Sequence, residues 1–136
     1  MVIITYLKGS REQASYDLFK GISKNIIRRK KSALMLLHSN GCPDCPEAVR
    51  AFEIAVKDYY GETGFYSVNV GTISEWKRED KNGRASKFIT DDLNVKSIPT
   101  ILLYISGKLD STNPLNSSRY DDHVEEISDL IKKSEN

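Results

Sequence analysis

Residues 33–45 read ALMLLHSNGCPDC, an apolar run followed closely by two cysteines with two residues between them. A continuous apolar run of this length is typical of a central strand that is buried on both faces. Cys42 and Cys45 are the only cysteines of the chain, and thiols at this spacing can close a disulfide. The pattern predicts a strand that leads into a helix, with two thiols where the helix begins.

The position of Cys42 favours a reactive thiolate. Backbone N–H groups and the helix dipole stabilise negative charge at a helix start, so we expect them to lower the pKa of the Cys42 thiol. Cys45, one turn further in, should be more buried and able to attack the sulfur of Cys42. Pro43 is expected in the first helical turn, where it stiffens the ring between the thiols. Asp44 either disfavours the thiolate and keeps the dithiol reducing, or simply suits the helix dipole.

Strand and helix patterns alternate around this motif. Strands are expected at 3–7, 33–37, 65–70 and 100–105, and helices at about 10–22, 42–59 and 122–131. Gly107 turns the chain into Lys108-Leu109, which predicts an antiparallel hairpin, followed by a polar loop over 110–120. Together these elements predict one α/β domain over residues 1–136, with a central mixed sheet, helices on both faces and a polar insertion at about 71–86.

Composition and charge exclude several classes of protein. Apolar residues make up 39% and charged residues 29%, and the net charge is +1, so no overall field attracts nucleic acid or a membrane. The basic cluster at 28–31 suits a solvated turn, with a localisation or anion-binding patch as the alternative. No membrane-spanning run or signal peptide is evident, so we expect the cytoplasm, where dithiols stay reduced.

A second motif, Ser97-Ile98-Pro99-Thr100, directly precedes the strand expected at 100–105. X-Pro bonds are where cis peptides occur, and proline at a strand start donates no ladder hydrogen bond. Together with Cys42 and Cys45, this motif resembles the thioredoxin superfamily across nearly the whole chain. Within that superfamily, Cys-Pro-Asp-Cys and the segment 70–77, VGTISEWK, most resemble the cytosolic thioredoxin-related proteins of the Clot type.

The resemblance implies the thioredoxin fold and a thiol–disulfide oxidoreductase activity. Cys42 would be the nucleophile and Cys45 the resolving thiol. A cis Pro99 would face the pair, and the backbone of Ile98 would bind an extended substrate segment. Electrons would come from NADPH through thioredoxin reductase, or from glutathione. The exchange itself would need no bound cofactor or metal. Protein or small-molecule disulfides would be the substrates, and we expect a monomer.

Several positions depart from the family pattern. Gly41 stands where the family has Trp before the first cysteine, so an aromatic part of the substrate surface is missing. Leu36 stands where ordinary thioredoxins place a buried Asp that relays a proton to the second cysteine, and Asp44 is the candidate for part of that role. Residues 103–105 replace a more charged strand end. Trp76 either anchors the insertion to the sheet edge or forms a wall of the substrate cleft.

Other functions stay open from the sequence alone. A zinc site could combine Cys42 and Cys45 with His38 or His123, although structural zinc sites usually pair two ligand clusters. His38 is otherwise expected near the active-site surface, where it could tune Cys42, and His123 is expected to face solvent. The chain could also be a thioredoxin-fold binding module without redox turnover, or a glutaredoxin-like reductase that depends on glutathione.

Overall fold

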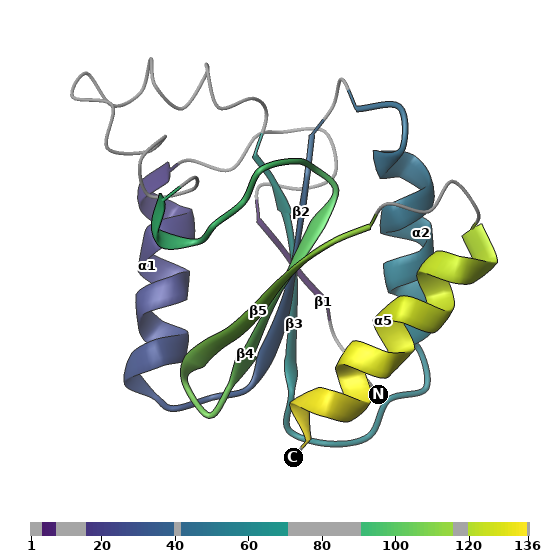
Figure 1. Cartoon of the computed structure of the whole chain (residues 1–136). Coiled ribbons are helices and arrows are strands. Elements are labelled where there is room, and N and C mark those ends of the chain that lie inside the picture. Colours follow the sequence, from purple (N-terminus) through teal and green to yellow (C-terminus); the bar gives the residue numbers. More distant parts are fainter. Residues whose placement is uncertain (1–3, 8–15, 40–41, 71–90, 116–119, 136) are drawn as a thin grey trace.

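A five-stranded mixed sheet lies at the centre of the described structure (Figure 1). The computed structural model describes residues 4–7, 16–39, 42–70, 91–115 and 120–135. The strands are β1 (Ile4–Leu7), β2 (Ala33–His38), β3 (Gly64–Asn69), β4 (Thr100–Ile105) and β5 (Lys108–Pro114), in the spatial order β1-β3-β2-β4-β5. β1, β3 and β2 run parallel, whereas β4 is antiparallel to β2 and β5 is antiparallel to β4.

Helices cover both faces of this sheet. α1 (Tyr16–Arg28) lies on one face, and α2 (Cys45–Val56) packs beside α5 (Tyr120–Ser134) on the other (Figure 1). The predicted α/β architecture with a mixed sheet is therefore confirmed. The insertion predicted at 71–86 lies outside the described residues. No helix within the described ranges is both long and apolar enough to cross a bilayer.

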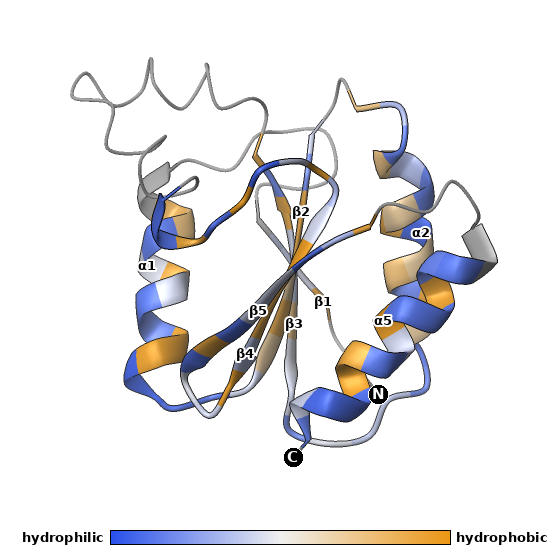
Figure 2. Ribbon diagram, viewed as in Figure 1, coloured by the Kyte–Doolittle hydropathy of each residue, from blue (hydrophilic) through white to orange (hydrophobic). Residues whose placement is uncertain are grey.

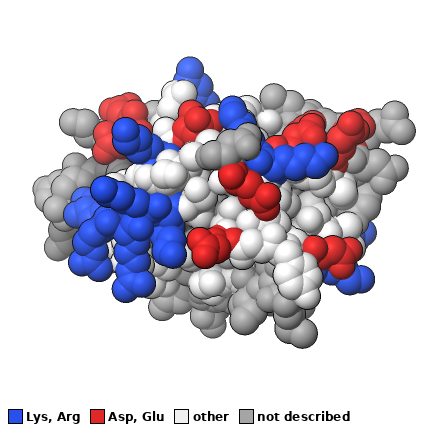
Figure 3. All heavy atoms as spheres, turned by 90° about the horizontal axis from the view of Figure 1, so that it is seen from below, with Lys and Arg blue, Asp and Glu red and all other residues white. Residues whose placement is uncertain are grey.

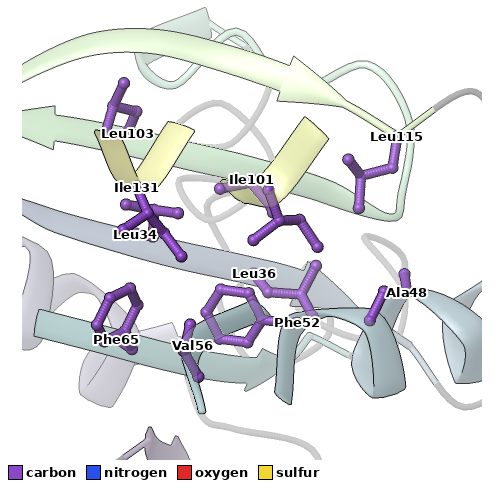
Figure 4. Close-up of a cluster of buried hydrophobic side chains, with 12 residues drawn as sticks. Leu34, Leu36, Ala48, Phe52, Val56, Phe65, Ile101, Leu103, Leu115 and Ile131 are labelled. Carbon is purple, nitrogen blue, oxygen red and sulfur yellow. The ribbon is translucent and has the colours of Figure 1, made fainter. Parts of the chain in front are cut away.

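The central strand β2 contributes to both layers of the core. All six of its residues are buried, as the apolar run predicts. Met35 and Leu37 join the cluster that includes α1, whereas Leu34 and Leu36 join the cluster formed with α2 and α5. Figure 4 shows the second cluster, in which Leu36 lies among apolar side chains of neighbouring elements. Apolar and hydrophilic residues alternate along the helices, as expected of helices with one buried stripe (Figure 2).

The last strand is longer than the sequence indicated. β5 continues through Pro114, although a polar loop was expected over 110–120. Among the described strands it pairs with β4 alone, and its side chains are exposed or partly exposed, so they can be polar. Pro114 suits the end of an edge strand, because it cannot donate a ladder hydrogen bond.

The final helix also begins earlier than expected. α5 starts at Tyr120, two residues before the start expected at about 122. His123 was expected to face solvent, but it is only 1% exposed. It precedes the buried Ile127 and Ile131 by four and eight residues, and this spacing places all three on one helix face.

The basic cluster lies at the end of the molecule away from the cysteines. Residues 28–31 are exposed and precede the first residue of β2, whereas Cys42 and Cys45 follow its last residue. Lys and Arg side chains gather on one side of the face seen from below (Figure 3). Basic side chains suit this position, because the last carbonyl groups of α1 carry the negative end of its dipole.

Candidate active site

The cysteine pair lies between the end of β2 and the beginning of α2. The helix begins at Cys45, with Asp44 as its N-cap residue, so Cys42 precedes the helix instead of opening it. The N–H of Cys45 donates to the carbonyl oxygen of Cys42 at 3.3 Å, which closes the turn that contains Pro43. Placing Pro43 in the first helical turn was therefore wrong. Pro46 occupies the first turn instead. An N–H group at that position would have no acceptor within the helix, so proline costs no hydrogen bond there.

Cys42 and Cys45 are joined by a disulfide, and their Cα atoms are 5.3 Å apart. Cys45 is only 1% exposed, whereas Cys42 is partly exposed. This difference in burial agrees with the expectation that Cys45 lies deeper. It makes Cys42 the sulfur that a partner in solution can reach.

The loop that contains Ile98 and Pro99 lies beside the partly exposed Cys42. The peptide bond between these two residues is cis. The carbonyl oxygen of Ile98 lies 3.8 Å from Sγ of Cys42. The hydroxyl of Thr100 donates to the carbonyl oxygen of Ser97 at 2.6 Å, which ties the loop to the first residue of β4. The fold thus brings the two sequence motifs together.

A pocket of about 240 Å³ borders the buried Cys45. It is lined by Tyr6, His38, Ser39, Cys45, Pro46, Val49 and Ser67, which come from β1, the end of β2, β3 and the first turns of α2. The sequence alone did not indicate Tyr6 or Ser67. The strand register is the signal that pairs them, because Tyr6 lies beside Ser67 in the parallel ladder.

Two titratable side chains in this pocket have shifted pKa values. Nε2 of His38 lies 3.1 Å from Oγ of Ser67, and burial lowers the pKa of His38 from 6.5 to about 4, because desolvation disfavours the charged ring. The hydroxyl of Tyr6 donates to Oε2 of Glu53 at 2.9 Å. Burial first, and then the hydrogen bond and charge of Glu53, raise the pKa of Tyr6 to about 12.

The other predicted site residues lie elsewhere or outside the described residues. The side chain of Asp44 is exposed, makes no capping hydrogen bond and does not line the pocket beside Cys45. Leu36 is fully buried in the apolar cluster of Figure 4. Gly41 and Trp76 lie outside the described residues. In the part of the chain that is described, no group of three or more His, Cys, Asp or Glu side chains could hold a metal ion.

Solved structures similar to this chain are thioredoxins. Thioredoxin O2 from Arabidopsis thaliana in the oxidised state is 15% identical, with a TM-score of 0.63 over 96% of this chain and 92% of that chain. Thioredoxin from Malassezia sympodialis is 18% identical, with a TM-score of 0.57 over 96% and 95% of the two chains. A structure of ferredoxin:thioredoxin reductase with thioredoxin f2 is 13% identical, with a TM-score of 0.57 over 94% of both chains. Identities this low show the fold alone, which is the thioredoxin fold.

The family follows from a match in sequence. No curated protein matches the chain. A family model described as the thioredoxin domain of thioredoxin domain-containing protein 17-like proteins matches residues 28–126, which include both cysteines and the Ile98–Pro99 loop. The chain therefore belongs to the thioredoxin domain-containing protein 17-like family of thioredoxin domains.

Proposed function

We propose that this protein is a dithiol–disulfide oxidoreductase that works through Cys42 and Cys45. The observation that carries the proposal is the bond between a partly exposed Cys42 and a buried Cys45, beside the loop of Ile98 and Pro99. Exchange rates depend on access to each sulfur, so a pair in which a substrate can reach one cysteine and not the other favours an ordered reaction. The burial of the two residues fits such an order.

The exchange proceeds in two steps. The Cys42 thiolate attacks one sulfur of the substrate disulfide, so that a mixed disulfide forms and the first substrate thiolate leaves. The Cys45 thiolate then attacks Sγ of Cys42, the mixed disulfide breaks, and the second substrate thiolate leaves and takes up a proton. The substrate gains two electrons and the protein pair loses two, which gives the bonded pair seen in the structure.

The surroundings of Cys42 favour its role as the attacking sulfur. It lies just before the N-terminus of α2, where the positive end of the helix dipole stabilises a thiolate. Pro43 restricts the turn between the sulfurs. The exposed carboxylate of Asp44 is negative and disfavours a second negative charge on Cys42. The backbone of Ile98 and the ring of Pro99 would bind the extended segment around the substrate disulfide, because their loop already contacts Cys42.

The reduced pair must be regenerated by another dithiol or thiol system. We propose NADPH, through thioredoxin reductase, as the electron source, with glutathione as the alternative. We also propose that the chain is most closely related to the Clot-type subgroup of the superfamily. One of the similar structures contains a thioredoxin with ferredoxin:thioredoxin reductase, which supports a reductase as partner. The substrates would be protein or small-molecule disulfides, and the protein would act as a monomer in the cytoplasm without a bound cofactor.

A redox titration tests the proposal directly. The protein is equilibrated in dithiothreitol or glutathione buffers of stepped potential, alkylated and weighed. The chain has two cysteines, so the reduced form gains two labels and the oxidised form none. We expect one two-electron transition near the thioredoxin value of roughly −270 mV.

Single substitutions give the test its controls. Cys45→Ser should accumulate a mixed disulfide with the substrate, because the resolving thiol is gone, whereas Cys42→Ser should form none, because Cys45 is buried. A pair that never closes would favour the binding-module alternative. Turnover that requires glutathione would favour the glutaredoxin-like alternative.

A further inference from the structure

A second pocket, of about 510 Å³, lies at the end of the molecule away from the cysteines. Its walls come from the turn between α1 and β2, the loop before β3, the turn between β4 and β5, and the end of α5. Pockets that hold small molecules measure roughly 300–1,000 Å³. The thiol exchange proposed for Cys42 and Cys45 gives this pocket no role.

The pocket carries cations that the protein itself leaves unpaired. Arg29, Lys30 and Lys31 line it, and all three residues are exposed. Figure 3 shows this end of the molecule, where Lys and Arg side chains gather on one side. Within the described ranges, none of these three side chains takes part in a hydrogen bond or an ion pair. Their charges are therefore available to an anion.

The end of α1 does not need these side chains as hydrogen-bond donors. The backbone N–H groups of Arg29, Lys30 and Lys31 donate to the last carbonyl groups of the helix, at 3.0–3.2 Å. The positive charges suit the negative end of the helix dipole. Because the backbone already satisfies the carbonyl groups, the side chains can reach a ligand without opening the helix.

The rest of the lining is neither basic nor apolar. Glu62 and Glu135 contribute two carboxylates, and neither forms an ion pair with a described residue. Tyr60 adds an aromatic side chain that is 86% exposed. Oγ of Ser32 accepts the N–H of Ser106 at 3.0 Å, which leaves the hydroxyl hydrogen for donation. The pocket thus combines cations, hydrogen-bond acceptors and an aromatic ring.

The walls are held by bonds between the elements that form them. The N–H of Gly64 donates to the carbonyl oxygen of Ser32 at 3.0 Å, which joins the loop before β3 to the turn before β2. The hydroxyl groups of Thr63 and Ser134 are 2.8 Å apart and join the same loop to the end of α5. The backbone of the pocket is therefore formed in advance, so binding costs little ordering of the chain.

This mixed lining discriminates among anions. A sulfate or an inorganic phosphate would meet the two carboxylates as well as the cations, and it offers nothing to an aromatic ring. A nucleotide has a partner for each kind of group. Its phosphates suit the cations, its base can stack on a tyrosine, and its hydroxyl and amino groups can donate to carboxylates.

We propose that this pocket binds a nucleoside di- or triphosphate. The phosphates lie against Arg29, Lys30 and Lys31, and the base lies against the ring of Tyr60. The binding is non-covalent and uses no cysteine, so the proposal does not rest on the thiol exchange.

Calorimetric titration of the oxidised full chain with adenosine triphosphate, without magnesium, tests the proposal. We expect one saturable site, with an affinity that falls as salt is raised to about 0.15 M. Arg29→Gln and Lys31→Gln should each weaken binding by about fivefold or more, because each removes a charge-assisted contact to phosphate.

Arg28→Gln is the matched control. Arg28 belongs to the same basic cluster and has the same charge, but its guanidinium donates to Asn25 and does not line the pocket. Its loss should change the affinity by no more than about twofold. Equal weakening by Arg28→Gln and Lys31→Gln would reduce the effect to a general attraction between charges and overturn the proposal, as would the absence of saturable binding.

Tripolyphosphate tests the contribution of the nucleoside, because it is an anion of similar charge without a base. It should bind about fivefold more weakly than adenosine triphosphate, and Tyr60→Ala should remove most of that difference. Tripolyphosphate that binds as tightly as the nucleotide would overturn the assignment of a nucleotide. Cys42→Ser should bind adenosine triphosphate like the unsubstituted protein, so failure of the redox titration and failure of this proposal are separate results.

Discussion

Thr100 holds the loop that lies beside Cys42. Its side chain is buried, and its hydroxyl donates to the carbonyl oxygen of Ser97 at 2.6 Å. The carbonyl oxygen of Ile98 lies between these two residues in sequence and contacts Sγ of Cys42 at 3.8 Å. One hydroxyl group therefore helps to hold the backbone that contacts Cys42.

Replacing that hydroxyl should destabilise the protein. Thr100→Val keeps the shape of the side chain but leaves the carbonyl oxygen of Ser97 without this donor, and should lower the free energy of unfolding by about 1–2 kcal/mol. Urea denaturation of the oxidised protein measures the loss. Thr100→Ser retains the hydroxyl and should lose clearly less. Equal stability of the valine variant and the unsubstituted protein would rule out a role for the bond.

His38 should make stability depend on pH in mildly acidic solution. Its pKa is about 4 in the folded protein, against 6.5 in the unfolded chain. The unfolded chain therefore binds this proton first as the pH falls, so the contribution is fully present above about pH 6.5 and is lost toward pH 4. Near pH 5 the loss should be about 2 kcal/mol.

The comparison between variants isolates this effect. Urea denaturation of the unsubstituted protein and of His38→Leu, each near neutral pH and near pH 5, gives the two changes in stability. The unsubstituted protein should lose more than the variant by the amount stated above, because leucine binds no proton. The same loss in both proteins would assign the pH dependence to other groups.

At the scale of elements, two turns that are far apart in sequence are bound to each other. The N–H of Gly107, between β4 and β5, donates to the carbonyl oxygen of Lys31 at 2.8 Å. Gly107 has a φ of +84°, and a Cβ there would lie 2.6 Å from Cα of Lys30 and 2.8 Å from the carbonyl oxygen of Ile27. Only glycine allows this close approach of the two backbones.

Two glycine substitutions should therefore have opposite effects. Gly107→Ala should lower the free energy of unfolding by at least about 2 kcal/mol, through the positive φ and the contact with backbone atoms. Gly21 lies in α1 with no atom within 4 Å of an added Cβ, so Gly21→Ala should stabilise the helix by up to about 1 kcal/mol. Thermal or urea denaturation of both variants measures the contrast. A Gly107→Ala protein as stable as the parent would disprove the close approach.

The sequence predicted apolar elements better than polar ones. β4 begins and ends where its apolar run does, at Thr100 and Ile105. In contrast, β5 is built from polar residues, because one edge and much of its surface face solvent, so its composition looked like that of a loop. The buried face of a helix is also hard to predict from sequence, since Leu18 is 38% exposed whereas the equally apolar Phe19 beside it is fully buried. A shift of one residue rotates a helix face, and packing against β2 decides which face is buried.

At the scale of the whole molecule, the sheet separates two apolar clusters. Ile26 of α1 belongs to one cluster and Ile127 of α5 to the other. Phe52 and Phe65 lie within the second cluster, with ring centroids 6.2 Å apart. The separation predicts which pairs of core substitutions act independently.

Core substitutions on opposite faces should add. Ile26→Val and Ile127→Val should each lower the free energy of unfolding by about 1 kcal/mol, and the double variant should lose their sum to within about 0.5 kcal/mol. Phe52→Leu with Phe65→Leu is the contrasting pair and should deviate from additivity, because the two rings contact each other. A clear coupling between Ile26 and Ile127 would mean that strain passes through the sheet.

The candidate site shows where sequence reasoning reached its limit. Cys42, Cys45 and the Ile98–Pro99 motif could be recognised because each is a short local pattern. The pocket beside Cys45 could not, because its walls come from four elements whose register only the fold supplies. Asp44 was a plausible proton-transfer group by its nearness in sequence, yet it is exposed and does not line that pocket, whereas His38 does.

The burial of Cys45 has a consequence for timing. In the proposed exchange, its sulfur can meet one other sulfur only, Sγ of Cys42, because the residue is 1% exposed and bonded to Cys42 in the oxidised form. Substrates would thus differ in how readily they reach Cys42, whereas the lifetime of each covalent complex would depend on the attack by Cys45 and on the pKa of the departing substrate thiol. A mutation that changes only the attack by Cys45 would then alter this lifetime without changing the surface that selects the substrate.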